Sequence, residues 1–455
     1  MRRRILVTAV AALALTSGLA LTAASAVSAS SGGTIKVVFQ IQGGDPALTV
    51  LMHTAATEFQ KAYPGWKVNF EPITSPAEND YYTKLDLMNQ SASTAPDVMY
   101  EDTFLVNSDV AAGYLAPLDS YLASWSGWKE FSKAAQAAAR GADGHTYGVS
   151  MGTDTRGLWY NKAVLSKAGV ALPWQPKTWA DVLAVAEKIK ATEPGVTPIN
   201  VYGGVGQGEG STMQGFEMFL YGTNNTLFDY STGKWEEAGA GFKAALGIYQ
   251  TIYNKDNLGP SVQTALGSQA WQVVQQSDMP VGKLGIDLDG SWVGGTYLPT
   301  GPKPWPQWQS ALGIAAMPTE NGQAPGKVSM SGGWLLSVGS HSANKQMAFN
   351  FITIALNQQN SLYYDVHASQ IASRADVASA TAYKAQGHAA AAFSSFVPFT
   401  HFRPAFTAYP KLSTEIQEIT GELMTGQETP AQGAAAYNKY LIATVGAKNV
   451  EAAPM

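Results

Sequence analysis

The order of apolar and polar positions predicts alternating strands and helices near the start of the chain. Residues 34–42 alternate apolar and polar side chains, which is typical of a strand with one buried face. Residues 48–59 repeat apolar side chains at helical spacing before the helix-breaking Tyr63-Pro64-Gly65. The next predicted elements are a strand, a helix and a strand: 68–70, 85–92 and 96–100. This β-α-β-α-β order indicates a parallel sheet covered by helices, and hence an α/β protein.

The later chain continues this alternation. Strands are predicted at 146–150 and 157–160, and Thr178 and Asp181 have the spacing of a capping box at the start of a helix. Further helices are predicted at 348–356, at 416–423 and after Thr429-Pro430, where proline suits the first helical position. The glycine-rich stretch 202–210 and the stretch 297–309 are predicted loops.

Composition narrows the class of protein. The chain has 455 residues, enough for two or more lobes at roughly 100–200 residues each. Apolar residues make up 45% and charged residues 14%, so a folded chain is expected. The formal net charge of −5 argues against nucleic acid and anionic membranes as partners, because both attract strongly basic surfaces.

The first 29 residues have the pattern of a secretory signal peptide. Arg2, Arg3 and Arg4 precede an apolar stretch at 5–21, and small residues follow at 24–29. Removing three of the 29 basic residues leaves 26 against 34 acidic residues, a mature charge of −8. A membrane anchor and twin-arginine export remain open alternatives. No later stretch reaches 18 uninterrupted apolar residues, so we expect a mature protein outside the cytoplasm with no transmembrane segment.

The reactive residue types argue against metal, thiol and cofactor chemistry. The chain has no cysteine, which excludes disulfides, thiol catalysis and a lipid anchor on an N-terminal cysteine. Its six histidines are scattered, and none forms a metal-binding pair with another four residues away. We therefore predict neither a metal nor a cofactor.

Three sequence features suggest an enzyme, but each is weak evidence for one. Gly148-Val149-Ser150-Met151-Gly152 matches a nucleophile elbow, but a second strand is predicted where that motif needs a helix. The glycines of 202–210 do not match a phosphate-binding loop. Acidic pairs such as Glu101-Asp102 keep a secreted glycoside hydrolase as an alternative, since such enzymes use two facing carboxyl groups.

Six motifs occur in one order along almost the whole mature chain. They are Phe59-Gln60-Lys61-Ala62-Tyr63-Pro64-Gly65, Ala95-Pro96-Asp97-Val98, Gly113-Tyr114-Leu115-Ala116-Pro117-Leu118-Asp119, Tyr160-Asn161-Lys162 with Lys177-Thr178-Trp179, Gly282-Lys283-Leu284 with Gly290-Ser291-Trp292, and Ser342-Ala343-Asn344-Lys345. Together they resemble the extracellular solute-binding proteins of carbohydrate ABC importers (family 1, maltose-binding-protein-like). Gly285-Ile286 replaces the usual methionine after Gly282-Lys283, and the lipobox cysteine of many relatives is absent.

This resemblance implies a periplasmic-binding-protein-like fold, with two α/β lobes joined by a hinge and a ligand cleft between them. The N-terminal lobe would comprise 32–152 plus 335–385, and the C-terminal lobe 153–330 plus 390–450. The predicted parallel sheets agree, because the carboxyl ends of their strands meet at a crevice.

The resemblance and the predicted strand ends together give the candidate ligand-binding residues. They are Gln42, Gly43, Asp45, Glu101, Asp102, Asp154, Asp289, Trp292, Gly333, Trp334, Phe402 and Arg403. Flat aromatic rings can stack on the apolar faces of sugar rings, while carboxylates and arginines can bond their hydroxyl groups. Structural roles compete with these assignments, because a tryptophan can belong to the core, Asp45 can cap a helix and Arg403 can pair with a surface acid.

The predicted function is capture of a sugar, with an oligosaccharide favoured by the abundance of aromatic residues. Closure of the two lobes on the ligand would be followed by delivery to the permease subunits of an ABC importer, without chemical change to the sugar. We expect a monomer. The alternatives are a secreted glycoside hydrolase and a binding protein for another solute, such as a polyol, glycerol phosphate or a peptide.

Overall fold

The computed structural model describes residues 32–41, 46–75 and 78–454. The predicted signal peptide lies outside the described residues, and so do the candidates Gln42, Gly43 and Asp45. Among the described residues, no helix combines the length and the apolar character that a bilayer-spanning segment needs.

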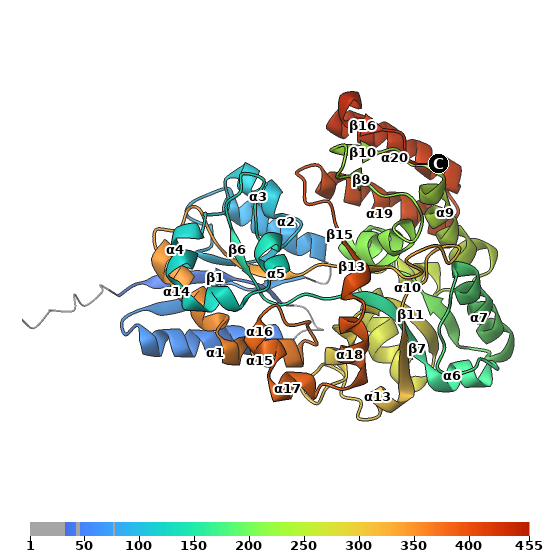
Figure 1. Ribbon diagram of the computed structural model, residues 1–455, viewed down its shortest axis with the longest axis horizontal. Helices are drawn as coiled ribbons and strands as arrows, with labels where there is room; N and C mark the ends of the chain where they lie inside the picture. The colour runs from blue at the N-terminus through green and yellow to red at the C-terminus, as the bar shows by residue number, and fades with distance from the viewer. Residues whose placement is uncertain (1–31, 42–45, 76–77, 455) are drawn as a thin grey trace, which may run out of the picture.

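A five-stranded sheet forms one side of the molecule (Figure 1). Its strands are, in spatial order, β3 (Lys67–Phe70), β1 (Thr34–Val38), β5 (Val98–Asp102), β14 (Trp334–Val338) and β6 (Gly148–Ser150). β1 runs parallel to β3 and β5, whereas β14 runs antiparallel to β5 and β6. The predicted parallel sheet is therefore present, extended by the antiparallel β14 from late in the chain and by β6, which pairs with β14.

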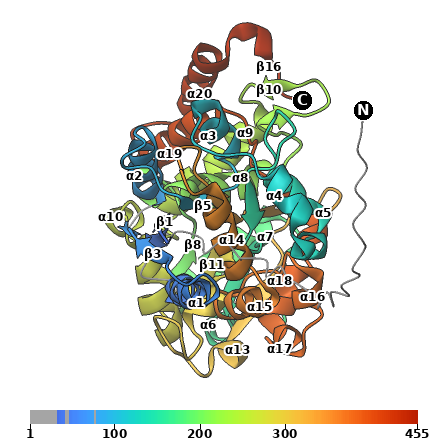
Figure 2. The ribbon, with the colours of Figure 1, turned by 90° about the vertical axis from the view of Figure 1, so that its left-hand side faces the viewer.

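Helices cover this first sheet. α1 (Pro46–Ala62) packs against α14 (Lys345–Ala355) and α15 (Gln358–His367), as Figure 2 shows. α2 spans Glu78–Asn89, so the predicted helix at 85–92 was placed too late. The helix begins earlier because Tyr81 and Tyr82 are buried on its inner face and extend its packing toward the N-terminus.

A four-stranded sheet forms the other side of the molecule (Figure 1). Its strands are β12 (Leu312–Ala315), β7 (Arg156–Asn161), β11 (Leu284–Gly290) and β8 (Thr197–Asn200). The predicted strand at 157–160 is β7. The predicted capping box is present at α7 (Trp179–Thr192), and Trp174 and Trp179 are buried, as expected of core residues.

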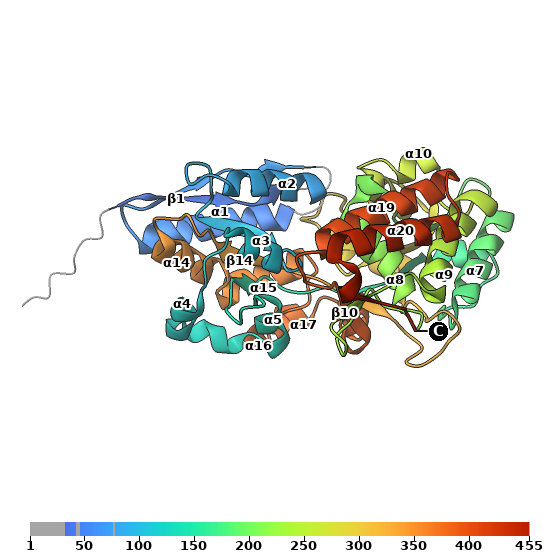
Figure 3. The same cartoon turned by 90° about the horizontal axis from the view of Figure 1, so that it is seen from above.

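The C-terminal helices also lie on the side of the second sheet (Figure 3). α19 (Tyr409–Thr425) packs on α20 (Pro430–Val445), whose first turn carries a capping box from Thr429. The two predicted loops include short helical segments, Val205–Gln207 in the first and the start of α13 (Trp308–Ala311) in the second.

The chain passes between the two sheets along neighbouring paths. The segment 151–155 joins β6 to β7, and Gly332 and Gly333 join β13 (Ser329–Ser331) to β14. β13 also pairs with β15 (Thr400–Phe402) in the middle of the molecule (Figure 1). Because Ser150 is followed by this crossing segment and not by a helix, the nucleophile-elbow interpretation does not hold.

Two glycines meet where the first two crossing segments touch. Gly152 has φ 129° and Gly333 has φ 153°. A Cβ atom on Gly333 would lie 2.9 Å from the Gly152 carbonyl oxygen. A hydrogen bond also joins the two segments there, because the Thr153 hydroxyl group donates to the Gly332 carbonyl at 2.8 Å. The crossing thus combines close backbone packing with conformations that favour glycine.

Candidate functional site

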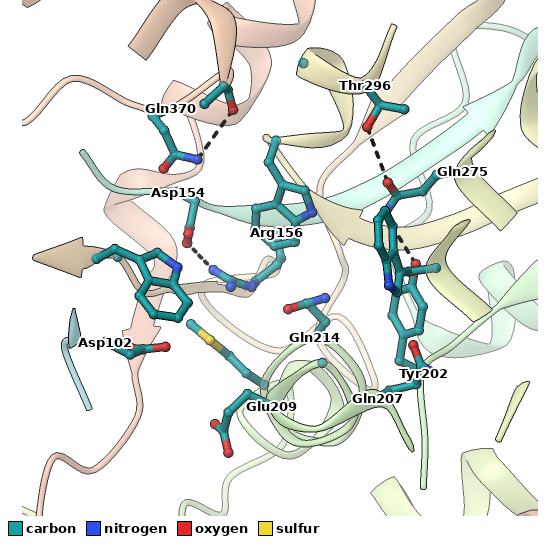
Figure 4. A pocket seen from close by; sticks show the side chains of 18 of the residues that line it. Asp102, Asp154, Arg156, Tyr202, Gln207, Glu209, Gln214, Gln275, Thr296 and Gln370 are labelled. Carbon is teal, nitrogen blue, oxygen red and sulfur yellow. Dashed lines mark hydrogen bonds and ion pairs between the residues drawn. The ribbon is translucent and has the colours of Figure 1, made fainter. Parts of the chain in front are cut away.

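A cavity of about 170 Å³ lies where the two sheets face each other. The first sheet contributes Asp102 at the end of β5 and Trp334 at the start of β14. From the other side come Arg156, the first residue of β7, and Trp292, which follows β11. The cavity therefore has walls from two separately built sheets, as Figure 4 shows.

Six of the predicted site residues line this cavity. They are Asp102, Asp154, Trp292, Gly333, Trp334 and Arg403. They come from positions far apart in the sequence, and the crossing segments together with the two sheets bring them to one place.

Glu101 does not reach the cavity, although its neighbour Asp102 does. Side chains alternate across a strand, so successive residues of β5 point to opposite faces of the sheet. Asp102 and Tyr100 line the cavity, whereas Glu101 is fully buried near Asp109 of α3 (Val106–Ala112). Burial and the nearby Asp109 carboxyl group raise the pKa of Glu101 well above its usual range.

Asp289 and Phe402 are likewise not part of the cavity wall. Asp289 lies behind it, where the Tyr202 hydroxyl donates to its carboxylate at 2.8 Å and the Gln275 amide at 2.7 Å. Burial raises the pKa of Asp289 to about 6, against the lowering effect of these donors and the Gly290 N–H. Phe402 ends β15 and is 54% exposed on the surface. Asp289 therefore orients lining residues and does not face the cavity itself.

Sequence reasoning missed much of the polar and aromatic wall. The missed residues include Arg156, Tyr202, Gln207, Glu209, Gln214, Trp271, Gln275, Thr296, Tyr364, His367 and Gln370. The stretch 202–210 was interpreted only as a flexible loop. It follows β8, a strand parallel to β11, so the strand-end argument that selected Asp102 could have found Gln207 and Glu209. Arg156 carries no comparable local signal.

The two predicted tryptophans are held differently. Trp334 stacks on Tyr100 with ring centroids 4.1 Å apart and an interplanar angle of 5°. Tyr82 also lies against Trp334, at 6.0 Å and 28°. Trp292 instead lies under the Arg156 guanidinium, 4.6 Å from the ring centroid. The indole of Trp334 is therefore held by aromatic neighbours on its own sheet and on α2, and that of Trp292 by a cation.

The charged groups of the cavity are paired with one another. The Arg403 guanidinium donates to Asp102 at 2.5 Å and to Glu209 at 3.1 Å. Arg156 donates to Asp154, whose carboxylate also accepts the Gly332 N–H at 2.9 Å. Burial raises the pKa of Glu209, while Arg403 and the Ser413 hydroxyl oppose that rise. Three carboxyl groups thus share two guanidinium groups, so each carboxyl group has a cationic partner.

Carboxamide groups provide the uncharged polar part of the wall. Gln207, Gln214 and Gln370 reach the cavity from different elements (Figure 4). A carboxamide offers both donors and an acceptor, so it can bond a hydroxyl group in either direction. Within the described part of the chain, no cluster of His, Asp and Glu has the arrangement of a metal site.

Two α/β units with crossing segments and a cavity between them define a periplasmic-binding-protein-like protein. The sequence model of the bacterial extracellular solute-binding protein family matches residues 43–361. The chain belongs to this family, which confirms both the resemblance seen in the sequence motifs and the predicted fold class.

Curated relatives agree with this assignment. A binding protein of Brucella abortus (strain 2308) is 23% identical over 407 residues, covering 84% of this chain and 87% of its own. A "Probable sugar-binding periplasmic protein" of Brucella suis is 26% identical over 219 residues, covering 47% and 48%.

Solved structures show the same fold. An ABC transporter solute-binding protein of Thermotoga lettingae, bound to α-D-tagatose, matches with a TM-score of 0.76 and 24% identity, covering 90% of this chain and 99% of its own. The GacH receptor of Streptomyces glaucescens matches with a TM-score of 0.75 and 22% identity, covering 92% and 100%.

Proposed function

We propose that this protein binds a neutral sugar in the cavity between its two sheets and is the solute-binding component of an ABC importer. The observation that carries the proposal is the composition of the cavity wall, which combines indole rings, carboxamides and mutually paired charges. Relatives named as sugar-binding periplasmic proteins and sugar-bound neighbours in the same fold support it.

The pairing of charges supports an uncharged guest. An anionic guest would have to compete with Asp102 and Glu209 for Arg403, and a cationic guest with Arg403 for the two carboxylates. Separating a buried ion pair leaves uncompensated charge in a poorly solvated place, which is costly. Hydroxyl groups can instead bond the carboxamides while leaving the ion pairs intact.

The same contacts support binding without catalysis. A glycoside hydrolase needs a carboxylic acid that is free to donate a proton to the glycosidic oxygen. Both oxygens of Glu209 are already bonded, one by Ser413 and Gln417 and the other by Arg403 and Tyr409. Asp102 is held in the same way by Arg403 and Tyr82. These carboxylates support the shape and charge of the wall.

The wider function follows from the family. We infer an N-terminal lobe of residues 32–152 plus 335–385 and a C-terminal lobe of 153–330 plus 390–450. Gly152 and Gly333 lie at the inferred hinge, where the backbone must change conformation for the lobes to move. The signal pattern at residues 1–29 supports export, after which the liganded monomer would meet its permease.

Isothermal titration calorimetry against mono- to tetrasaccharides tests the proposal. The panel covers both short and long sugars, because neighbours of this fold hold ligands as different as tagatose and acarbose. A uronic acid and an amino sugar matched to the best neutral ligand are the controls. We expect saturable binding of a neutral sugar and weaker binding of both charged analogues. Tighter binding of a charged analogue would contradict the argument from paired charges, and turnover of labelled oligosaccharide would contradict a binding role.

A further inference from the structure

A buried arginine connects the two sides of the cavity directly. Arg403 is 6% exposed and donates through separate nitrogen atoms to Asp102 and Glu209. Asp102 ends a strand of the first sheet, whereas Glu209 directly precedes the helix Gly210–Phe216 (η3), which packs against β11 of the second sheet. The three residues therefore link the two sides through ion pairs, in addition to the crossing chain segments.

Both carboxylates accept further hydrogen bonds besides those of the arginine. The Tyr82 hydroxyl donates to Asp102 at 2.9 Å. Ser413 donates to Glu209 on its other oxygen, and Tyr409 adds a bond of 3.3 Å. Because these groups already hold each carboxylate in place, little conformational freedom is lost when the bridge forms.

Neighbouring contacts reinforce the bridge. The Arg403 guanidinium lies 4.2 Å from the centroid of the Phe104 ring, and that ring meets Tyr409 edge to face at 5.6 Å. The Asn107 amide donates to the Ala405 carbonyl. A short segment after β5 and a short segment after β15 thus dock on each other around the arginine.

We propose that Asp102, Arg403 and Glu209 form a clasp that holds the two lobes together before any guest arrives. The proposal rests on the inferred two-lobe function and concerns how that site is regulated. A guest must touch both lobes to be held fully. The fraction of molecules whose lobes are already closed can therefore bind it without a further movement of the lobes. The apparent affinity then scales with that fraction, and the clasp raises affinity by enlarging it.

A direct role in ligand binding would give Arg403 a different signature. A guanidinium that contacts the guest changes affinity but leaves the conformation of the unliganded protein unchanged. The clasp changes the unliganded conformation itself. A distance between the lobes, measured without sugar, separates these roles and needs no knowledge of the natural ligand.

Double electron–electron resonance between two spin labels provides that distance. The chain has no cysteine, so Leu87→Cys on α2 and Gln263→Cys on α10 (Val262–Ala265) place labels only at two exposed positions, one on each side of the cavity. In the doubly labelled parent we expect a dominant short distance without sugar, which becomes still more populated when the best sugar is added. With Arg403→Met, at least half of the unliganded population should move to a longer distance and return when sugar is added. Arg403→Lys should give an intermediate shift, because one ammonium group cannot span both carboxylates as a guanidinium does.

Arg374→Met is the matched control. Arg374 is equally buried, at 5% exposure, pairs with Asp376 at 2.7 Å and lies 5.1 Å from the centroid of the Phe131 ring. All these partners lie within the inferred N-terminal lobe, so its loss should leave the distance distribution unchanged. If Arg403→Met does not fold, the triple change Asp102→Asn, Arg403→Met and Glu209→Gln removes the clasp without leaving a buried charge unpaired.

Two results would overturn the clasp. One is an unliganded parent already dominated by the long distance, and the other is a folded Arg403→Met or triple variant with the parent distribution. Failure of the sugar proposal is a separate result, because it would show as no calorimetric binding by a protein whose unliganded distance still depends on Arg403.

Discussion

Replacement of Trp334 by alanine is expected to weaken sugar binding strongly. Its indole lines the cavity and is stacked on Tyr100 at 4.1 Å, so one ring face is covered by Tyr100 and a guest can cover the exposed part of the other. A whole aromatic side chain buries about 150–250 Å², and roughly half of that area belongs to one face. At about 25 cal/mol per Å², the loss is about 2–3 kcal/mol, or about 1–3 kcal/mol if part of the face stays exposed.

Calorimetry on the best sugar at 25 °C measures this loss as a rise in Kd of roughly 5- to 150-fold. Trp334→Phe should lose less, because a smaller ring keeps the stack on Tyr100. Trp179→Phe is the control, since Trp179 is buried in α7 away from the cavity and should change the melting temperature but not Kd. A folded Trp334→Ala protein with the parent Kd would refute the stacking argument and assign Trp334 to the core.

Further predictions concern stability, the hinge and the surface. Burial raises the pKa of Asp109 to about 7 and that of Glu101 well above its usual range, so between pH 4 and 7 the folded chain keeps protons that the unfolded chain has lost. The free energy of unfolding should therefore fall as pH rises, by up to about 1.4 kcal/mol per pH unit for each group. Glu101→Gln should flatten this slope in thermal melts from pH 5 to 8. A slope that the substitution leaves unchanged would contradict a raised pKa at Glu101. Gly333→Ala should lower the free energy of unfolding in denaturant by about 1–3 kcal/mol, because φ at this position is positive and the new Cβ would meet the Gly152 carbonyl oxygen. An unchanged free energy of unfolding would show that the crossing segments can accommodate the Cβ atom. Phe402→Ser should leave sugar affinity unchanged in calorimetry, since the ring is on the surface, and a tenfold loss would place it in the site.

Individual residues show how far the sequence reached into the site. Trp292 and Asp102 could be found because each stands at a strand end within or beside a family motif, and such ends meet at the cavity. Glu101 could not be separated from Asp102, because the face on which a side chain emerges depends on the register of the whole strand. Gln207 and Glu209 could have been found by the same strand-end argument, but the sequence does not show that their stretch packs near β11 and α19.

The sequence by itself determined the alternation of strands and helices, the helix caps, the export signal pattern and the family. These features depend on residues close together in the chain, where propensity and periodicity act directly. Only the tertiary structure decided which charges are paired, because Arg403 and Asp102 are 301 residues apart. Local sequence carries no record of such a contact. It exists because two independently built sheets face each other and bury both groups, and a buried charge without a partner is costly.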